Sequence, residues 1–159
     1  MPWLATTALL HSSIVAEKRD TLKAWTILLA IVAFSFSLLG TFIVRSGVLI
    51  SVHAFASDPS RGLYILMLLI FFTGGALILF AKKAAYLKSG SLFQPLSREG
   101  ALVINNIIFA SSAATVLLGT LYPIFIDAIN NSKVSVGPPY FEAVFIPLMV
   151  PAILLCAFS

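Results

Sequence analysis

Two histidines are the side chains of this sequence best suited to chemistry. His11 lies in the apolar run TALLHSSIV, shortly before the charged residues that begin at Glu17. A polar ring inside an apolar run is expected to face a protein interior or a cofactor rather than lipid. His11 therefore has two readings: a hydrogen bond to a neighbouring helix, or axial ligation of a haem iron, for which imidazole is a good ligand.

His53 lies in a different setting, the polar run RSGVLISVHAFASDPSRG at residues 45–62. It is either a solvated loop side chain or a second ligand. Arg45 and Arg61 bracket it, and guanidinium groups bind carboxylates such as haem propionates through paired hydrogen bonds. Arginines at the ends of membrane spans also serve as interfacial anchors, so the sequence alone leaves both readings open.

Asn105 and Asn106 are adjacent polar residues within an apolar run. Because neighbouring helical side chains point about 100° apart, both cannot face lipid cheaply. Hydrogen bonds between helices are favoured here over a ligand role. The sequence shows no paired carboxylates, nucleophile–histidine pair or phosphate-binding glycine loop, and its single cysteine, Cys156, excludes an internal disulfide and a C-x-x-C-H motif. Hydrolysis and ATP chemistry are unsupported.

The elements that carry these residues are predicted to be membrane helices. Of the 159 residues, 60% are hydrophobic and 10% are charged, against about 25% charged in an average soluble domain. Three apolar blocks are long enough to cross a bilayer as helices, at residues 24–44, 63–81 and 101–122. Residues 1–16 and 145–159 are read as partial helices. We expect an all-α polytopic membrane protein with three complete transmembrane helices and a partial helix at each end.

The positive charges predict the orientation of these spans. Seven Lys and Arg residues fall in segments 17–23 and 82–100, and three fall in segments 45–62 and 127–144. By the positive-inside rule, the first pair of loops is cytoplasmic and the second pair faces outward. This asymmetry accounts for the net charge of +4, and a nucleic-acid role has no support.

Local sequence agrees with these boundaries. A helix is expected to begin at Asp58-Pro59, where a capping residue is followed by a proline. Another is expected to begin at Ser97, which is also a capping residue. Gly137-Pro138-Pro139 cannot continue a helix and is expected to hold the outward loop 127–144 in an extended form.

Several blocks together resemble one membrane-protein family. TALLHSSIVAEKR, SLLGTFIVRSGVLISVHAFASDPSRG, SREGALVINN, TVLLGTLYPIF and VSVGPPYFEAVFIPLM occur in the order of the CcmF family, the membrane core of the cytochrome c haem lyase. The resemblance covers almost the whole chain. The related NrfE-type proteins share these blocks and stay an alternative.

The resemblance implies a function. Family members receive haem from the carrier CcmE at the outer membrane face, while CcmH- or CcmI-type subunits present apocytochrome c, and thioether bonds join haem to its cysteines. By motif position, His11 matches an axial ligand of a b-type haem, and His53 matches a ligand of the transferable haem. Arg45 and Arg61 become candidate propionate partners. The expected location is the bacterial inner membrane, or the mitochondrial inner membrane for an organelle-encoded chain.

The chain also departs from the family pattern. The tryptophan-rich WWD segment is absent, with Trp3 just beyond its position, and each haem would find only one of its two histidine ligands here. We therefore expect a fragment, an internal start or one piece of a split gene, which requires the remaining parts of the same core and is inactive alone. Two rivals are a transporter fragment whose path is lined by His11, Asn105 and Asn106, and a nonfunctional remnant.

Overall fold

The computed structural model describes residues 1–48, 58–87, 97–130, 132 and 134–157. These residues form five α-helices and one short 3-10 helix, which confirms the all-α class. The helices are α1 (Pro2–Arg19), α2 (Lys23–Ser46), α3 (Pro59–Lys83), α4 (Arg98–Asn130) and α5 (Pro138–Cys156), and the 3-10 helix η1 (Ala84–Tyr86) follows α3 directly.

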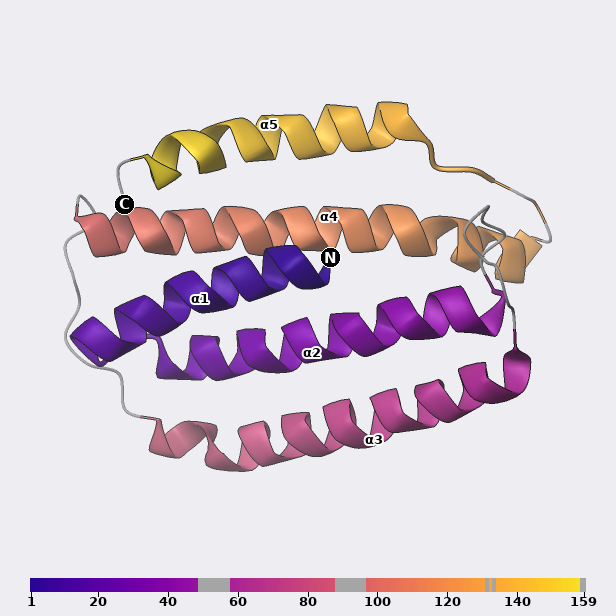
Figure 1. The fold of residues 1–159 in the computed structure, drawn as a ribbon, viewed down its shortest axis with the longest axis horizontal. Coiled ribbons are helices and arrows are strands. Elements are labelled where there is room, and N and C mark those ends of the chain that lie inside the picture. The colour runs from indigo at the N-terminus through magenta and orange to yellow at the C-terminus, as the bar shows by residue number, and fades with distance from the viewer. Residues whose placement is uncertain (49–57, 88–96, 131, 133, 158–159) are drawn as a thin grey trace.

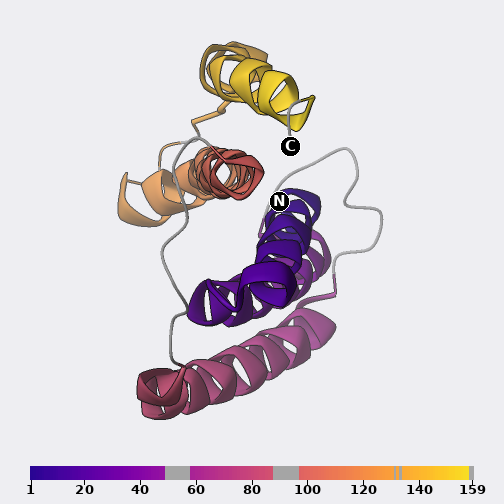
Figure 2. The same cartoon turned by 90° about the vertical axis from the view of Figure 1, so that its left-hand side faces the viewer.

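The five helices lie side by side in one curved row. Their order across the row is α3, α2, α1, α4, α5, so that α1 contacts both α2 and α4 while α3 and α5 lie at the edges (Figures 1 and 2). Neighbours in the row run in opposite directions (Figure 1). The order in space thus differs from the order in sequence, because α1 packs between α2 and α4.

The helices have the length and surface of membrane spans. Four of them, α2, α3 with η1, α4 and α5, are long and apolar enough to cross a bilayer. Large apolar side chains point outward along them, and Phe71 and Ile129 expose 73% and 74% of their surfaces. In water such exposure would be costly, whereas lipid tails solvate it.

Two predicted helix starts are confirmed by their caps. The Asp58 carboxylate accepts hydrogen bonds from the backbone N–H groups of Ser60 and Arg61, and Pro59 is the first residue of α3. The Ser97 hydroxyl accepts from the N–H of Gly100 at 3.0 Å, directly before α4. Side-chain oxygens in these positions satisfy N–H groups that have no partner inside the helix.

The predicted extended loop at residues 127–144 is much shorter in the structure. Helix α4 continues through Pro123 to Asn130, and α5 begins at Pro138 rather than near residue 145. Pro138 and Pro139 occupy the first turn of α5, where a proline is tolerated because the first helical N–H groups have no intrahelical partner. Gly137, the residue directly before the helix, has an extended conformation. With this start, α5 has 19 residues and reaches the length of a span.

Polar contacts join each pair of neighbouring helices. Hydroxyl pairs link α1 to α2 (Ser12 and Thr26, 2.6 Å) and α2 to α3 (Ser35 and Thr73, 2.8 Å). Arg19 pairs with Glu99 between α1 and α4, and the Tyr140 hydroxyl of α5 donates to the Thr115 carbonyl of α4 at 3.1 Å. In lipid, apolar burial does little to hold helices together, so such contacts and close packing fix the neighbours.

Candidate functional site

His11 lies near the middle of α1 and faces α4. Its ring centroid is 5.6 Å from that of Phe109, a buried member of the apolar core on α4. The two rings are tilted by 60° to one another. His11 is therefore held between two helices, and its ring has an aromatic neighbour on one side.

The imidazole of His11 has an unused buried nitrogen. Its Nδ1 atom is buried and makes no hydrogen bond. An unpartnered buried polar atom costs free energy that a ligand could recover. Among the described residues no hydrogen bond joins His11 to another helix, and both of its readings stay predictions.

This environment fits a haem ligand. A haem needs an imidazole nitrogen for its iron and apolar surroundings for its ring, and both are present beside His11. The histidine is carried by a helix that is tied to α2 through Ser12 and to α4 through Arg19. Its position is thus set by the packing of three helices.

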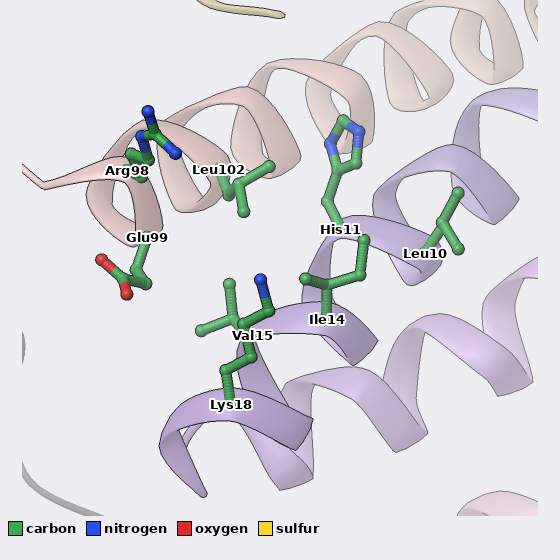
Figure 3. A pocket seen from close by; sticks show the side chains of 8 residues that line it. All are labelled: Leu10, His11, Ile14, Val15, Lys18, Arg98, Glu99 and Leu102. Atoms are coloured by element: carbon green, nitrogen blue, oxygen red, sulfur yellow. The ribbon is translucent and has the colours of Figure 1, made fainter. Parts of the chain in front are cut away.

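A cavity of about 400 Å³ opens beside His11 between α1 and α4. Figure 3 shows the His11 ring extending from α1 toward α4 within it. Both helices contribute apolar residues to the lining, and the charged lining residues lie toward the end of the bundle where α1 ends and α4 begins. The complete lining is Leu10, His11, Ile14, Val15, Lys18, Arg98, Glu99 and Leu102.

Arg45 lies in the last turn of α2, and Arg61 lies in the first turn of α3. The two helix ends are in close contact, since a Cβ atom added to Gly62 would lie 2.8 Å from the Cα of Ser46. The backbone N–H of Asp58 also donates to the carbonyl of Arg45 at 2.9 Å. The structure thus brings the two arginines to one end of the bundle.

Arg61 already has one acidic neighbour. Its Nε atom lies 3.2 Å from Oδ2 of Asp58. The backbone N–H of Arg61, followed by smaller contributions from Ser60 and the Arg61 charge, lowers the pKa of Asp58, while desolvation opposes this. The Nη groups of Arg61 keep their donors for a further carboxylate. His53 lies outside the described residues, and its ligand role stays a prediction.

Asn105 and Asn106 are both buried in α4. The Asn105 amide donates from Nδ2 to the Cys156 sulfur of α5 at 2.8 Å, as the favoured reading of hydrogen bonds between helices predicts. Neither asparagine lines the cavity beside His11. The site therefore consists of His11 and its cavity, with Arg45 and Arg61 grouped separately.

Lys18 and Arg98 line the cavity, although neither was predicted as a site residue. Lys18 could have been found, because it follows His11 by seven residues and so lies on the same helical face. Arg98 and Glu99 could not, since they reach the cavity only through the contact between α1 and α4.

These features define a polytopic α-helical membrane protein with a histidine inside the bundle available to a ligand. Comparison with known proteins gives the family. Residues 1–50 match the family model described as cytochrome C assembly protein. The chain is 60% identical over 159 residues to the cytochrome c-type biogenesis protein CycK of Rhizobium meliloti, covering 100% of this chain and 24% of that protein.

Two further relatives agree. CcmF of Escherichia coli is 50% identical over 155 residues, covering 98% of this chain and 24% of that protein. NrfE of Haemophilus influenzae is 42% identical over 156 residues, covering 98% of this chain and 25% of that protein. The solved structure of a cytochrome c heme lyase CcmF matches with a TM-score of 0.69 at 31% identity, covering 97% of this chain and 21% of that one.

Along its whole length, the chain is thus homologous to a segment of the CcmF family of cytochrome c-type biogenesis proteins, as its sequence blocks predicted. It spans about a quarter of the length of the curated relatives that it matches.

Proposed function

We propose that this chain forms part of the haem-handling core of a cytochrome c haem lyase in a bacterial inner membrane. The observation that carries the proposal is the buried, unpartnered Nδ1 of His11 beside a cavity inside the helix bundle. Homology to proteins named for cytochrome c biogenesis and haem lyase activity supports it. The same matches make haem the cofactor to test first.

In this proposal His11 would bind the iron of a b-type haem. Bound there, haem iron supplies one-electron redox chemistry within the membrane. His11 would hold the iron, and the links from α1 to α2 and α4 fix the position of its imidazole. The Phe109 ring lies beside that imidazole, 5.6 Å away between ring centroids, and supplies an apolar neighbour.

At the outward end, His53 is proposed to ligate the haem that is transferred to apocytochrome c. Arg45 and Arg61 would then bind its propionates, because the close contact of α2 with α3 holds them at one end. Attachment adds each cysteine S–H across a haem vinyl group, so that a C–S bond forms, the proton goes to the other vinyl carbon and no net oxidation occurs.

Attachment requires other proteins in this proposal. The haem carrier CcmE delivers haem, CcmH- or CcmI-type subunits present apocytochrome c, and the remaining parts of the core supply the second ligand of each haem. Since this chain spans about a quarter of its curated relatives, the activity is proposed for the assembly and not for this chain alone.

The rival transporter function stays an alternative. It requires His11, Asn105 and Asn106 to line a common polar path. The Oδ1 atoms of Asn105 and Asn106 are buried without a hydrogen-bond partner, but neither asparagine lines the cavity beside His11. Both asparagines are buried, and Asn105 bonds to Cys156 on the side of α4 that packs on α5. The haem proposal uses His11 without a polar path across the membrane.

The test is His11→Ala in the complete assembly, with b-type haem measured by reduced-minus-oxidised spectra. We expect most of this haem to be lost while membrane insertion and protein level stay near normal. Ser13→Ala is the matched control, because the Ser13 hydroxyl on the same helix donates only to the Leu10 carbonyl. Unchanged haem content in the His11→Ala assembly would refute the ligand role.

A further inference from the structure

The cavity beside His11 is apolar at one end and positively charged at the other. Leu10, Ile14 and Leu102 line it near the histidine, and Lys18 and Arg98 line it toward the end where α4 begins. Both cations are exposed, so they lie where the cavity meets solvent or headgroups. We refer to Lys18 and Arg98 as the cationic rim.

The spacing along α1 matches one bound molecule that reaches both ends. His11 and Lys18 are separated by two helical turns on one face, a rise of about 10.5 Å. Val15, which lines the cavity between them, is buried. A planar apolar molecule held by His11 would therefore direct one edge toward Lys18.

The one acidic residue that lines this cavity is already paired. The Glu99 Oε1 atom lies 2.6 Å from Nη2 and 2.8 Å from Nε of Arg19, an arginine outside the lining set. In Figure 3 the Glu99 carboxylate points away from the His11 ring. Within the described residues neither Lys18 nor Arg98 forms an ion pair, so the rim carries an excess of positive charge.

Arg98 occupies a position where its charge needs an explanation. It is the first residue of α4, and the N-terminus of a helix carries a partial positive charge that favours anions. The positive-inside rule accounts for cations on this side of the membrane, but not for two of them lining one cavity. An anionic group bound between them would stabilise both charges and use the helix end.

We propose that Lys18 and Arg98 bind the propionate carboxylates of the haem that His11 ligates. This inference rests on the proposed function. Arg98 offers a planar fork to one carboxylate, and Lys18 offers a point charge to the other. His11 would then hold the iron while the carboxylates are bound at the cationic rim. The phosphate of an anionic lipid headgroup is the other source of the same chemistry.

The experiment is the double substitution Lys18→Gln with Arg98→Gln in the complete assembly. Its readouts are the midpoint potential of the b-type haem and the fraction of haem kept through detergent washing. Removing the cations leaves the carboxylate charge unbalanced, so we expect a lower potential and at least a several-fold greater loss of haem. The charge-conserving pair Lys18→Arg with Arg98→Lys should keep both values closer to those of the parent.

Lys82→Gln is the matched control. Lys82 lies in the last turn of α3 at the same end of the bundle and does not line the cavity. Its loss should leave the potential unchanged. An equal shift in the Lys82→Gln assembly would mean a general surface-charge effect and would overturn the inference.

Haem dimethyl ester separates haem propionates from lipid phosphates. With the neutral ester bound to haem-free assembly, parent and double variant should retain the cofactor equally. A difference that persists with the ester, and that depends on anionic lipid, would assign the rim to lipid. An unchanged potential and haem content in the double variant would overturn this inference alone, whereas an unchanged haem content in His11→Ala would overturn the proposed function.

Discussion

At the scale of single residues, His11 and His53 are proposed to serve different haems on opposite sides of the membrane midplane. His11 lies near the middle of α1, whereas Arg45 and Arg61, which bracket His53 in sequence, lie where α2 ends and α3 begins. The two groups are therefore separated along the length of α2. Changes at one should leave the other largely intact.

His53→Ala in the complete assembly is expected to depress cytochrome c maturation severely while sparing the b-type haem. The reason is that one axial bond to the transferable haem is lost, whereas the His11 site is not touched. Both haem populations and covalent cytochrome c should be measured together.

Arg45→Gln and Arg61→Gln should cause milder losses of maturation, because the iron bond would survive the loss of a propionate contact. Normal maturation in the His53→Ala assembly would exclude the ligand role, since a solvated surface histidine contributes little. Loss of both haems together with low protein level would indicate a structural role instead.

Sequence could identify His11 as a buried polar side chain, but not its surroundings. The apolar run around it predicts burial, and in the structure the side chain is half-buried with its Nδ1 atom fully buried. Phe109, Arg98 and Glu99 reach the site only because α1 packs on α4, about 80 to 100 residues further along the chain. That contact depends on which helices become neighbours, and local sequence patterns do not predict helix neighbours.

At the scale of helices, the start of α3 and the end of α2 are in close backbone contact. A Cβ at Gly62 would meet backbone atoms of Ser46, which cannot move away as a flexible side chain could. The glycine is therefore required for this approach of α2 to α3.

Gly62→Ala should destabilise the protein by about 1–3 kcal/mol, the usual cost of overpacking a tight contact. Gly74→Ala is the control on the same helix, because nothing lies within 4 Å of a Cβ at that position. Its effect should be near zero or slightly stabilising. Unfolding of both variants in detergent provides the comparison, and equal stability of the two would show that α2 and α3 do not meet at Gly62.

The helices themselves could mostly be predicted from sequence. The length of each apolar run predicted where the helices lie, and Asp58 and Ser97 predicted where two of them begin. The start of α5 was missed because Pro138 and Pro139 were read as an extended loop, although they also fit the first helical turn. Which face of each helix is buried was harder to predict, since lipid and protein interior are similarly apolar, and only polar residues such as Ser12 and Asn105 mark the inner side.

At the scale of the whole molecule, the helix directions place most described cations at one end. Lys18, Arg19 and Lys23 lie around the connection from α1 to α2, and the last turn of α3 and the first residue of α4 add Lys82, Lys83 and Arg98. Arg45 and Arg61 lie at the other end. This grouping agrees with cytoplasmic segments 17–23 and 82–100, a topology that stays a prediction.

Cysteine labelling in intact cells tests that topology. Ser57→Cys, in a background with Cys156→Ala, should react with an impermeant thiol reagent added outside, because segment 45–62 is predicted to face outward. Ala85→Cys, at the opposite end of α3, should react only after the membrane is opened. The reverse pattern would invert the orientation.

The central claim is that His11 ligates a haem within the bundle, and imidazole rescue tests it most directly. His11→Gly removes the ring and leaves space for a free imidazole in the same position. The complete assembly carrying this change should show an altered or missing low-spin b-type spectrum that added imidazole restores. A parent-like spectrum in His11→Gly without imidazole would contradict the claim.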